Sequence, residues 1–167
     1  MSFLYFSYGS NMLNRRILIN CPSAIYKCNA KLEKYQLLFT GYSNSWKGAP
    51  ATIIKNEKDS VWGVVWEILK EHEDALNRQE RGYQEIYIPV CSEEKTLMCK
   101  SYQMQVDENS DHLPSPMYKN VIIQGAKEHC LPSFYIQKLE SIQDNGYDGK
   151  VEIPISNCDV VTSKENY

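Results

Sequence analysis

The first two-thirds of the chain alternates between short apolar runs and polar turns, a pattern typical of β-strands. Residues 3–8 are apolar and aromatic and end at Gly9, which predicts a buried strand that feeds a tight turn. Residues 51–54 and 60–68 flank the polar stretch 56–59 and predict a hairpin. The second of these segments is apolar on both faces, which suits a strand covered on two sides, as in a barrel with helices outside.

Two further segments, residues 86–91 and 96–104, continue the strand pattern, whereas helical signals prevail later in the chain. Residues 70–80 are polar and rich in helix-forming side chains, which predicts a helix inserted between strands. Ser115-Pro116 combines an N-cap with a proline at the first helical position and predicts a second helix, and Leu131-Pro132-Ser133 begins a third. Early strands and late helices predict an α+β fold.

The length of 167 residues corresponds to one domain, and no repeat or linker divides the chain. Residues 107–116 are polar and contain two prolines, which predicts a long loop. From Asn145 onward the chain is polar. We expect a single domain over residues 1–150, followed by a polar C-terminal tail over residues 151–167.

Composition and charge narrow the class of protein. Hydrophobic residues make up 43% and charged residues 23%, as in globular proteins and unlike disordered chains. Lysine and arginine total 18 against 21 acidic residues, a net charge of −3, which argues against a nucleic-acid partner. The first residues lack the basic region of a signal peptide, and no apolar run approaches the ~18 residues of a membrane-spanning helix. We therefore expect a cytoplasmic protein without a membrane partner.

Cysteine and tyrosine are the residue types whose use changes this picture. The six cysteines are scattered, with no Cys-x-x-Cys pair and no matching histidine pairs, so the sequence predicts no metal centre. Tyrosine supplies 12 residues, against 4 phenylalanines and 3 tryptophans. A buried tyrosine usually needs a hydrogen-bond partner, so these hydroxyl groups serve either the core or a polar pocket, and composition leaves both open.

Three local features are candidates for chemistry. Tyr8-Gly9-Ser10-Asn11 directly follows the first strand, and its successive N–H groups could bind an anion, although a tight turn with an asparagine cap is the simpler interpretation. Glu80 ends a predicted helix, where an acidic residue is ordinarily a solvated charge. Tyr118 lies just inside another helix, where it is ordinarily a core or interface aromatic. The sequence contains no order typical of a Ser-His-Asp triad and no phosphate-binding loop.

Taken in order, these segments resemble the γ-glutamylcyclotransferases, and the resemblance spans residues 3 to about 150. The combination is specific, whereas the Tyr-Gly-Ser loop alone is shared more widely. One departure is Arg81, because family members similar to this chain have glycine directly after the glutamate. The residues that carry the resemblance are Phe3 to Met12, Ser45-Trp46-Lys47-Gly48 with Ala51-Thr52-Ile53, Val61-Trp62-Gly63-Val64-Val65-Trp66, Gln79-Glu80, Pro114-Ser115-Pro116-Met117-Tyr118-Lys119, Gly125-Ala126-Lys127-Glu128 and Leu131-Pro132.

The resemblance implies a mixed β-barrel with helices packed around it. It also implies an enzyme of glutathione metabolism, a lyase-type acyl transferase that converts a γ-glutamyl-amino acid into 5-oxoproline and a free amino acid without cofactor or metal. The small-molecule γ-glutamyl substrate is the implied partner, and a homodimer is left open. The implied catalytic residue is Glu80, and the implied substrate-binding residues are Tyr5, Phe6, Ser7, Tyr8, Gly9, Ser10 and Tyr118.

The chemistry of this reaction suits these residue types. The substrate's own α-amine attacks its γ-carbonyl, so no enzyme nucleophile is needed. A carboxylate whose pKa is raised toward neutrality can take the proton of the α-ammonium and deliver it to the leaving nitrogen. The N–H groups of the Tyr8-Gly9-Ser10 turn would bind either the α-carboxylate or the developing oxyanion.

Three alternatives stay open at the level of the sequence. The substrate could be glutathione or a γ-glutamylamine. The related glutathione-specific and γ-glutamylamine cyclotransferases also use a catalytic glutamate on a related barrel. The loop sequence Tyr8-Gly9-Ser10-Asn11-Met12 favours neither. A non-catalytic protein that binds small molecules on the same barrel is the third alternative, and it predicts that Glu80 points to solvent, away from this loop.

Overall fold

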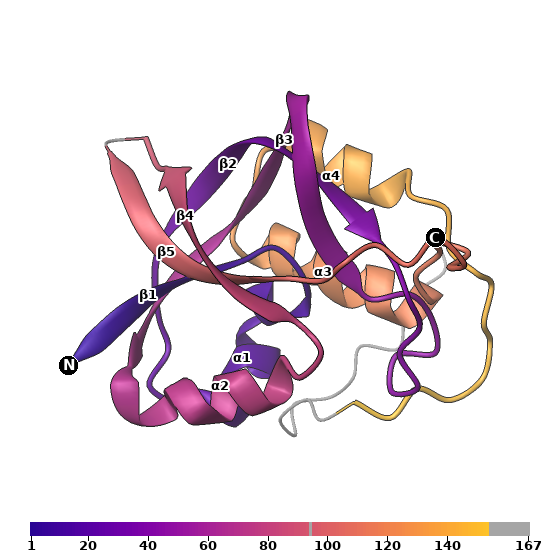
Figure 1. Ribbon diagram of the computed structural model, residues 1–167, viewed down its shortest axis with the longest axis horizontal. Coiled ribbons are helices and arrows are strands. Elements are labelled where there is room, and N and C mark those ends of the chain that lie inside the picture. Colours follow the sequence, from indigo (N-terminus) through magenta and orange to yellow (C-terminus); the bar gives the residue numbers. More distant parts are fainter. Residues whose placement is uncertain (94, 154–167) are drawn as a thin grey trace.

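The computed structural model describes residues 1–93 and 95–153, and a closed barrel of five strands in the order β1-β3-β2-β4-β5 forms its centre (Figure 1). Neighbouring strands run antiparallel, except that β1 and β5 run parallel where they close the barrel. The predicted mixed barrel of an α+β fold is therefore confirmed. The strands are β1 (Ser2–Ser7), β2 (Ile25–Phe39), β3 (Ala51–Leu69), β4 (Gln84–Cys91) and β5 (Thr96–Gln103).

Two pairs of helices pack on the barrel (Figure 1). Helix α1 packs against α2, and α3 packs against α4 on a different side. Among the described residues, no helix is long and apolar enough to cross a membrane. The helices are α1 (Asn14–Asn20), α2 (Glu73–Gln79), α3 (Pro116–Glu128) and α4 (Ser133–Glu140), with short 3-10 helices η1 (Ser10–Met12) and η2 (Lys70–His72).

The three predicted helices are confirmed, and their ends follow the expected capping chemistry. The side chain of Ser115 accepts a hydrogen bond from the backbone N–H of Tyr118 at 3.2 Å, with Pro116 in the first helical position. The helix predicted over residues 70–80 begins as η2, continues as α2 and ends with Glu80 as its C-cap. The structure adds α1, whose seven residues are too short for a periodic sequence signal.

The predicted hairpin is wrong. Strand β3 runs through the polar stretch 56–59 and pairs with β2 on both sides of it. Partners on β2 are found for Lys55 and again for Ser60, so the four residues between them face Lys34 alone, whose φ is 63°. The polar stretch is therefore a bulge in the ladder, and the chain does not reverse there. Because both halves of β3 pair with the same strand, no hairpin can form.

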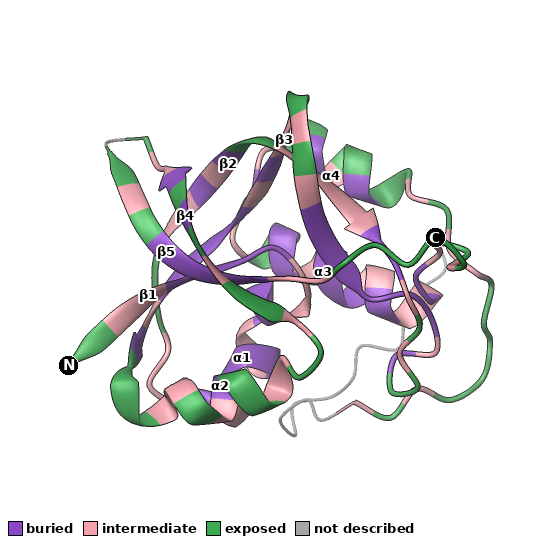
Figure 2. Ribbon diagram, viewed as in Figure 1, coloured by how far each residue is buried: buried purple, intermediate pink, exposed green. Residues whose placement is uncertain are grey.

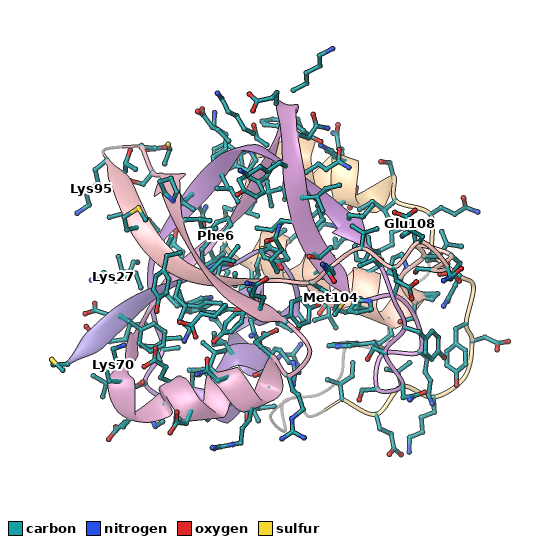
Figure 3. All side chains as sticks on the ribbon, viewed as in Figure 1. Phe6, Lys27, Lys70, Lys95, Met104 and Glu108 are labelled. Atoms are coloured by element: carbon teal, nitrogen blue, oxygen red, sulfur yellow. The ribbon has the colours of Figure 1, made fainter. Side chains whose placement is uncertain are left out.

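Strand β3 supplies the centre of the core. Val64 and Val65 point to opposite faces of the strand, and both are 0% exposed, as expected for a strand covered on two sides. Burial is concentrated in the strands and in the sides of α1 and α3 that face them (Figure 2). Phe6 lies in the middle of the barrel (Figure 3) and is fully buried.

The loop predicted over residues 107–116 is confirmed up to the start of α3, since it contains no strand and no helix before Pro116. Residues 143–153 likewise form no helix or strand. The predicted tail over residues 151–167 lies mostly outside the described residues, which end at 153.

Candidate active site

A cavity of about 350 Å³ opens beside the C-terminal end of β1. Strand β1 and η1 form one wall, the end of α2 contributes Glu80, and the first turn of α3 contributes Tyr118. Met104, which directly follows β5, also lines the cavity. The wall is rich in aromatic side chains, namely Tyr5, Tyr8, Tyr42, Trp46, Tyr83, Tyr102 and Tyr118.

The structure brings most of the predicted site residues together. Glu80 lies in the same cavity wall as the loop after β1, although 69 positions separate it from Asn11 in the chain. The predicted residues that line the cavity are Tyr5, Tyr8, Gly9, Ser10, Glu80 and Tyr118.

Phe6 and Ser7 are not among the described residues that line the cavity. Phe6 faces the interior of the barrel and is 0% exposed. The hydroxyl of Ser7 accepts a hydrogen bond from Trp66 Nε1 at 3.0 Å and donates one to the carbonyl of Val64 at 3.3 Å. Both side chains therefore hold β1 in the barrel and do not contribute to the cavity wall.

Glu80 is partly buried and is held by an amide. Asn11 Nδ2 donates hydrogen bonds to Glu80 Oε1 and to the hydroxyl oxygen of Tyr5, both at 3.2 Å. Burial raises the pKa of the Glu80 carboxyl to about 7, and the positive charge of Arg16 acts in the opposite direction. A carboxyl with this pKa can both accept and donate a proton near neutral pH.

A chain of amides determines how Asn11 is oriented. Gln79 Nε2 donates to Asn11 Oδ1 at 2.8 Å, and Asn20 Nδ2 on α1 donates to Gln79 Oε1 at 2.7 Å. Since the oxygen of Asn11 is occupied by Gln79, its NH₂ group faces Glu80. Three amides from three elements thus present donors in one direction, toward the carboxyl.

The hydroxyl groups of the aromatic wall are partly engaged with the barrel. Tyr118 accepts a hydrogen bond from the N–H of Ala51 at 3.0 Å, and Tyr83 donates one to the carbonyl of Ala51 at 2.6 Å. Tyr8 donates to the backbone carbonyl of Tyr102. Burial raises the pKa of Tyr8 and of Tyr118, so these phenols stay neutral.

The sequence of this chain is similar to those of known enzymes. The chain is 43% identical to "Gamma-glutamylcyclotransferase" of Bos taurus over 159 residues, which cover 90% of this chain and 84% of the relative. The relative of the same name from Homo sapiens is 42% identical, with the same coverage. The chain belongs to the γ-glutamylcyclotransferase family. It is therefore an enzyme, and the model of the AIG2-like family matches its residues 60–139.

The fold of this γ-glutamylcyclotransferase family member agrees with a solved relative. A structure titled "Gamma-glutamyl cyclotransferase" superposes with a TM-score of 0.86 at 42% identity, covering 91% of this chain and 94% of that one. The arrangement of barrel and helices is thus shared over nearly the whole length of both proteins.

Several side-chain roles at this γ-glutamylcyclotransferase site were not predicted from the sequence. The sequence analysis names Asn11 only as part of the loop after the first strand and Gln79 only as part of the motif before Glu80. Arg16 is 8% exposed and its guanidinium lies 5.7 Å from the ring centre of Trp46 in the cavity wall; in sequence it is one of two arginines in a short polar run. The described residues contain no group of three or more His, Cys, Asp or Glu side chains placed to hold a metal ion.

Proposed function

We propose that this enzyme converts γ-glutamyl-amino acids into 5-oxoproline and a free amino acid, with Glu80 as general base and general acid. One observation carries the proposal. The Glu80 carboxyl, whose pKa is about 7, lies in the wall of the cavity that the Tyr8-Gly9-Ser10 loop also lines. A glutamate turned to solvent would instead favour a non-catalytic binding protein.

The reaction needs one proton carrier and no enzyme nucleophile. The carboxylate of Glu80 takes a proton from the substrate's α-ammonium, and the freed amine nitrogen attacks the γ-carbonyl carbon to form a new C–N bond. Glu80 then returns the proton to the nitrogen of the leaving amino acid as the old C–N bond breaks. One amide replaces another, so no cofactor is consumed, and a folded substrate geometry in the cavity lowers the entropic barrier.

The loop and Tyr118 are suited to hold the substrate. The oxygen of Tyr118 accepts the N–H of Ala51, which leaves its own O–H proton for a substrate acceptor. The first N–H groups of a helix have no acceptor within it, so those at the start of η1 suit the α-carboxylate or the developing oxyanion. Gly9 lies beside the Tyr118 hydroxyl, since a Cβ on Gly9 would be 3.5 Å from it. Phe6 and Ser7 support this loop from inside the barrel.

The variant Glu80→Gln tests the catalytic role. The amide keeps an acceptor for Asn11 but cannot take a proton, so we expect kcat to fall by about 10²–10⁴-fold with KM changed less than about 3-fold. The measurement is 5-oxoproline release from γ-glutamyl-alanine. The matched control is Glu71→Gln, an exposed acid on η2 away from the cavity, which should leave kcat unchanged. Wild-type turnover in a folded Glu80→Gln protein would refute the mechanism.

A panel of three substrates separates the alternative enzymes. We expect 5-oxoproline release to be fastest from γ-glutamyl-alanine, and slower from glutathione and from γ-glutamyl-lysine. A higher kcat/KM for glutathione would point to the glutathione-specific activity, and one for γ-glutamyl-lysine to the amine-releasing activity. Binding of these compounds without any 5-oxoproline would leave only the non-catalytic alternative.

A further inference from the structure

The cavity wall carries a specific combination of charges. Among the described residues that line it, the charged ones are Arg16, Glu80 and Arg81. A γ-glutamyl-amino acid carries two carboxylates and one ammonium at neutral pH. We propose that Arg81 binds the carboxylate of the leaving amino acid and thereby selects substrates whose leaving group carries a carboxylate beside the scissile amide. This inference rests on the proposed function.

Arg81 lines the cavity directly beside Glu80 in the chain. It directly follows Glu80 in the turn after α2, where the N–H of Tyr83 donates to the Glu80 carbonyl at 2.9 Å and Gly82 has a φ of 97°. Glu80 must approach the scissile nitrogen, because it returns a proton to that atom. In an α-amino acid leaving group the carboxylate carbon is two bonds from the same nitrogen. Because Arg81 lines the same cavity as Glu80, its long side chain can reach this carboxylate.

Arg81 is also available to bind an anion. It is exposed, and none of the ion pairs in the described part of the chain includes it. Several lysines, by contrast, are already paired with a carboxylate, such as Lys138 with Asp59 at 2.7 Å. A guanidinium can bind a carboxylate through two parallel hydrogen bonds.

The two arginines lie at different depths in the cavity, so each suits a different carboxylate of the substrate. Arg16 is 8% exposed and packs over Trp46, so it belongs to the inner part of the cavity and suits the α-carboxylate of the γ-glutamyl group. Arg81 belongs to the rim, together with Tyr42, which is 61% exposed. With Glu80 ionised the wall carries a net charge of +1, from two arginines and one glutamate. This charge complements a substrate of net charge −1 and gives no such advantage to a γ-glutamyl-alkylamide, which is a zwitterion of net charge zero.

Two substrates that differ only in this carboxylate test the proposal. γ-Glutamyl-ethylamide is γ-glutamyl-alanine with hydrogen in place of the leaving-group carboxylate. We expect Arg81→Gln to lower kcat/KM for γ-glutamyl-alanine by about 10-fold, mainly through KM, and to change that for the ethylamide less than about 3-fold. The matched control is Arg78→Gln, an exposed arginine in the last turn of α2 that does not line the cavity, and it should alter neither substrate.

Binding to the inactive enzyme separates this proposal from the proposed function. Calorimetry with Glu80→Gln, with and without Arg81→Gln, should show about 10-fold weaker binding of γ-glutamyl-alanine and unchanged binding of the ethylamide. An equal loss for both ligands, or no loss for either, overturns the role of Arg81. Absence of 5-oxoproline from every substrate with the wild-type enzyme would overturn the proposed function. The binding comparison would still decide whether Arg81 binds the leaving-group carboxylate.

Discussion

At the scale of single residues, the amide of Asn11 determines how the Glu80 carboxyl is held in the cavity wall. Its NH₂ group donates to Glu80, its oxygen accepts from Gln79, and Gln79 in turn accepts from Asn20. An amide has donors on nitrogen and an acceptor on oxygen, so reversing one member of the chain reverses every member after it. Asn20 therefore acts on Glu80 without lining the cavity.

Asn20→Asp should move the pH profile of the enzyme. A carboxylate cannot donate, so Gln79 would turn its NH₂ group toward residue 20 and its oxygen toward Asn11. Asn11 would then present an acceptor to Glu80, which favours the protonated carboxyl and raises its pKa above about 7. Because the proposed mechanism uses the Glu80 carboxylate as the base, activity should be lost as the pH falls through this pKa. The ascending limb of the pH profile of kcat/KM should therefore shift upward by about one unit.

The control for this variant adds the same charge to the same helix. Asn14→Asp lies at the other end of α1, and no described hydrogen bond joins Asn14 to the amide chain. Its profile should keep the wild-type midpoint. Equal shifts in both variants would mean that added charge, and not the direction of the amides, acts on Glu80.

The location of Glu80 illustrates what local sequence leaves undetermined. The charged end of a short helix is ordinarily solvated, and only the resemblance of the whole chain singled out Glu80. Burial in the folded protein raises its pKa, and Asn11, which donates to its carboxyl, lies 69 positions away in the sequence. Arg16 was not predicted for the same reason, since its contact with Trp46 forms only when the chain folds.

At the scale of elements, a helix or strand could be predicted where neighbouring residues or a clear apolar pattern signal it. The start of α3 was predictable because its cap depends on neighbouring residues, Ser115 and Pro116. Strand β2 was missed because its fully buried side chains are only Ala30, Leu32 and Phe39, so its sequence lacks an apolar alternation. Without β2 as the partner, the polar bulge in β3 was interpreted as a turn.

Helix α3 also carries a contact that supports the site. A Cβ added at Gly125 would lie 2.8 Å from the backbone nitrogen of Leu13 and 2.8 Å from Met12 Cβ. The helix therefore approaches η1 and its C-cap at backbone distance. Since η1 includes Asn11, this close approach fixes the element that holds the Glu80 carboxyl.

Gly125→Ala should consequently destabilise the protein, although alanine is the better helix former by about 1 kcal/mol. The added methyl group must displace η1 or α3, and we expect the free energy of unfolding to fall by about 1–3 kcal/mol. Turnover should fall as well, because Asn11 moves with η1. Urea unfolding and kcat measure the two effects. Lys127→Ala, at an exposed position of the same helix, should change each only slightly, and a stabilised, fully active Gly125→Ala protein would contradict the packing argument.

At the scale of the whole molecule, one ion-pair cluster joins the strands that close the barrel to α2, the helix that precedes Glu80. Strands β1 and β5 close the barrel in parallel, with Tyr5 opposite Lys100. Lys100 is 2% exposed, and its Nζ lies 2.8 Å from Glu85 on β4 and 3.0 Å from Glu73 at the start of α2. Barrel closure and the position of α2, which leads to Glu80, thus depend on the same ammonium group.

Lys100→Met should lower the free energy of unfolding at pH 7 by about 1–3 kcal/mol, because it removes a buried ammonium and leaves the partly buried Glu73 and the exposed Glu85 without this partner. Lys70→Met is the matched control. Lys70 pairs with the same Glu73 at 3.0 Å but is exposed, and an exposed pair contributes about 0–1 kcal/mol. Chemical unfolding of both variants at neutral pH measures the difference.

The pH dependence of the stability lost in Lys100→Met shows whether the loss comes from the charge of Lys100. Hydrogen bonds from lysine lower the pKa of both carboxyls, from Lys70 and Lys100 for Glu73 and from Lys100 for Glu85. A carboxyl with a lowered pKa in the folded state stabilises the protein above its ordinary pKa near 4.5, and this stabilisation is lost as the pH falls through the folded value. The difference in the free energy of unfolding between wild type and Lys100→Met should therefore become smaller below about pH 4. A gap that stays constant down to acidic pH would mean that Lys100 contributes through the packing of its aliphatic stem and not through its charge.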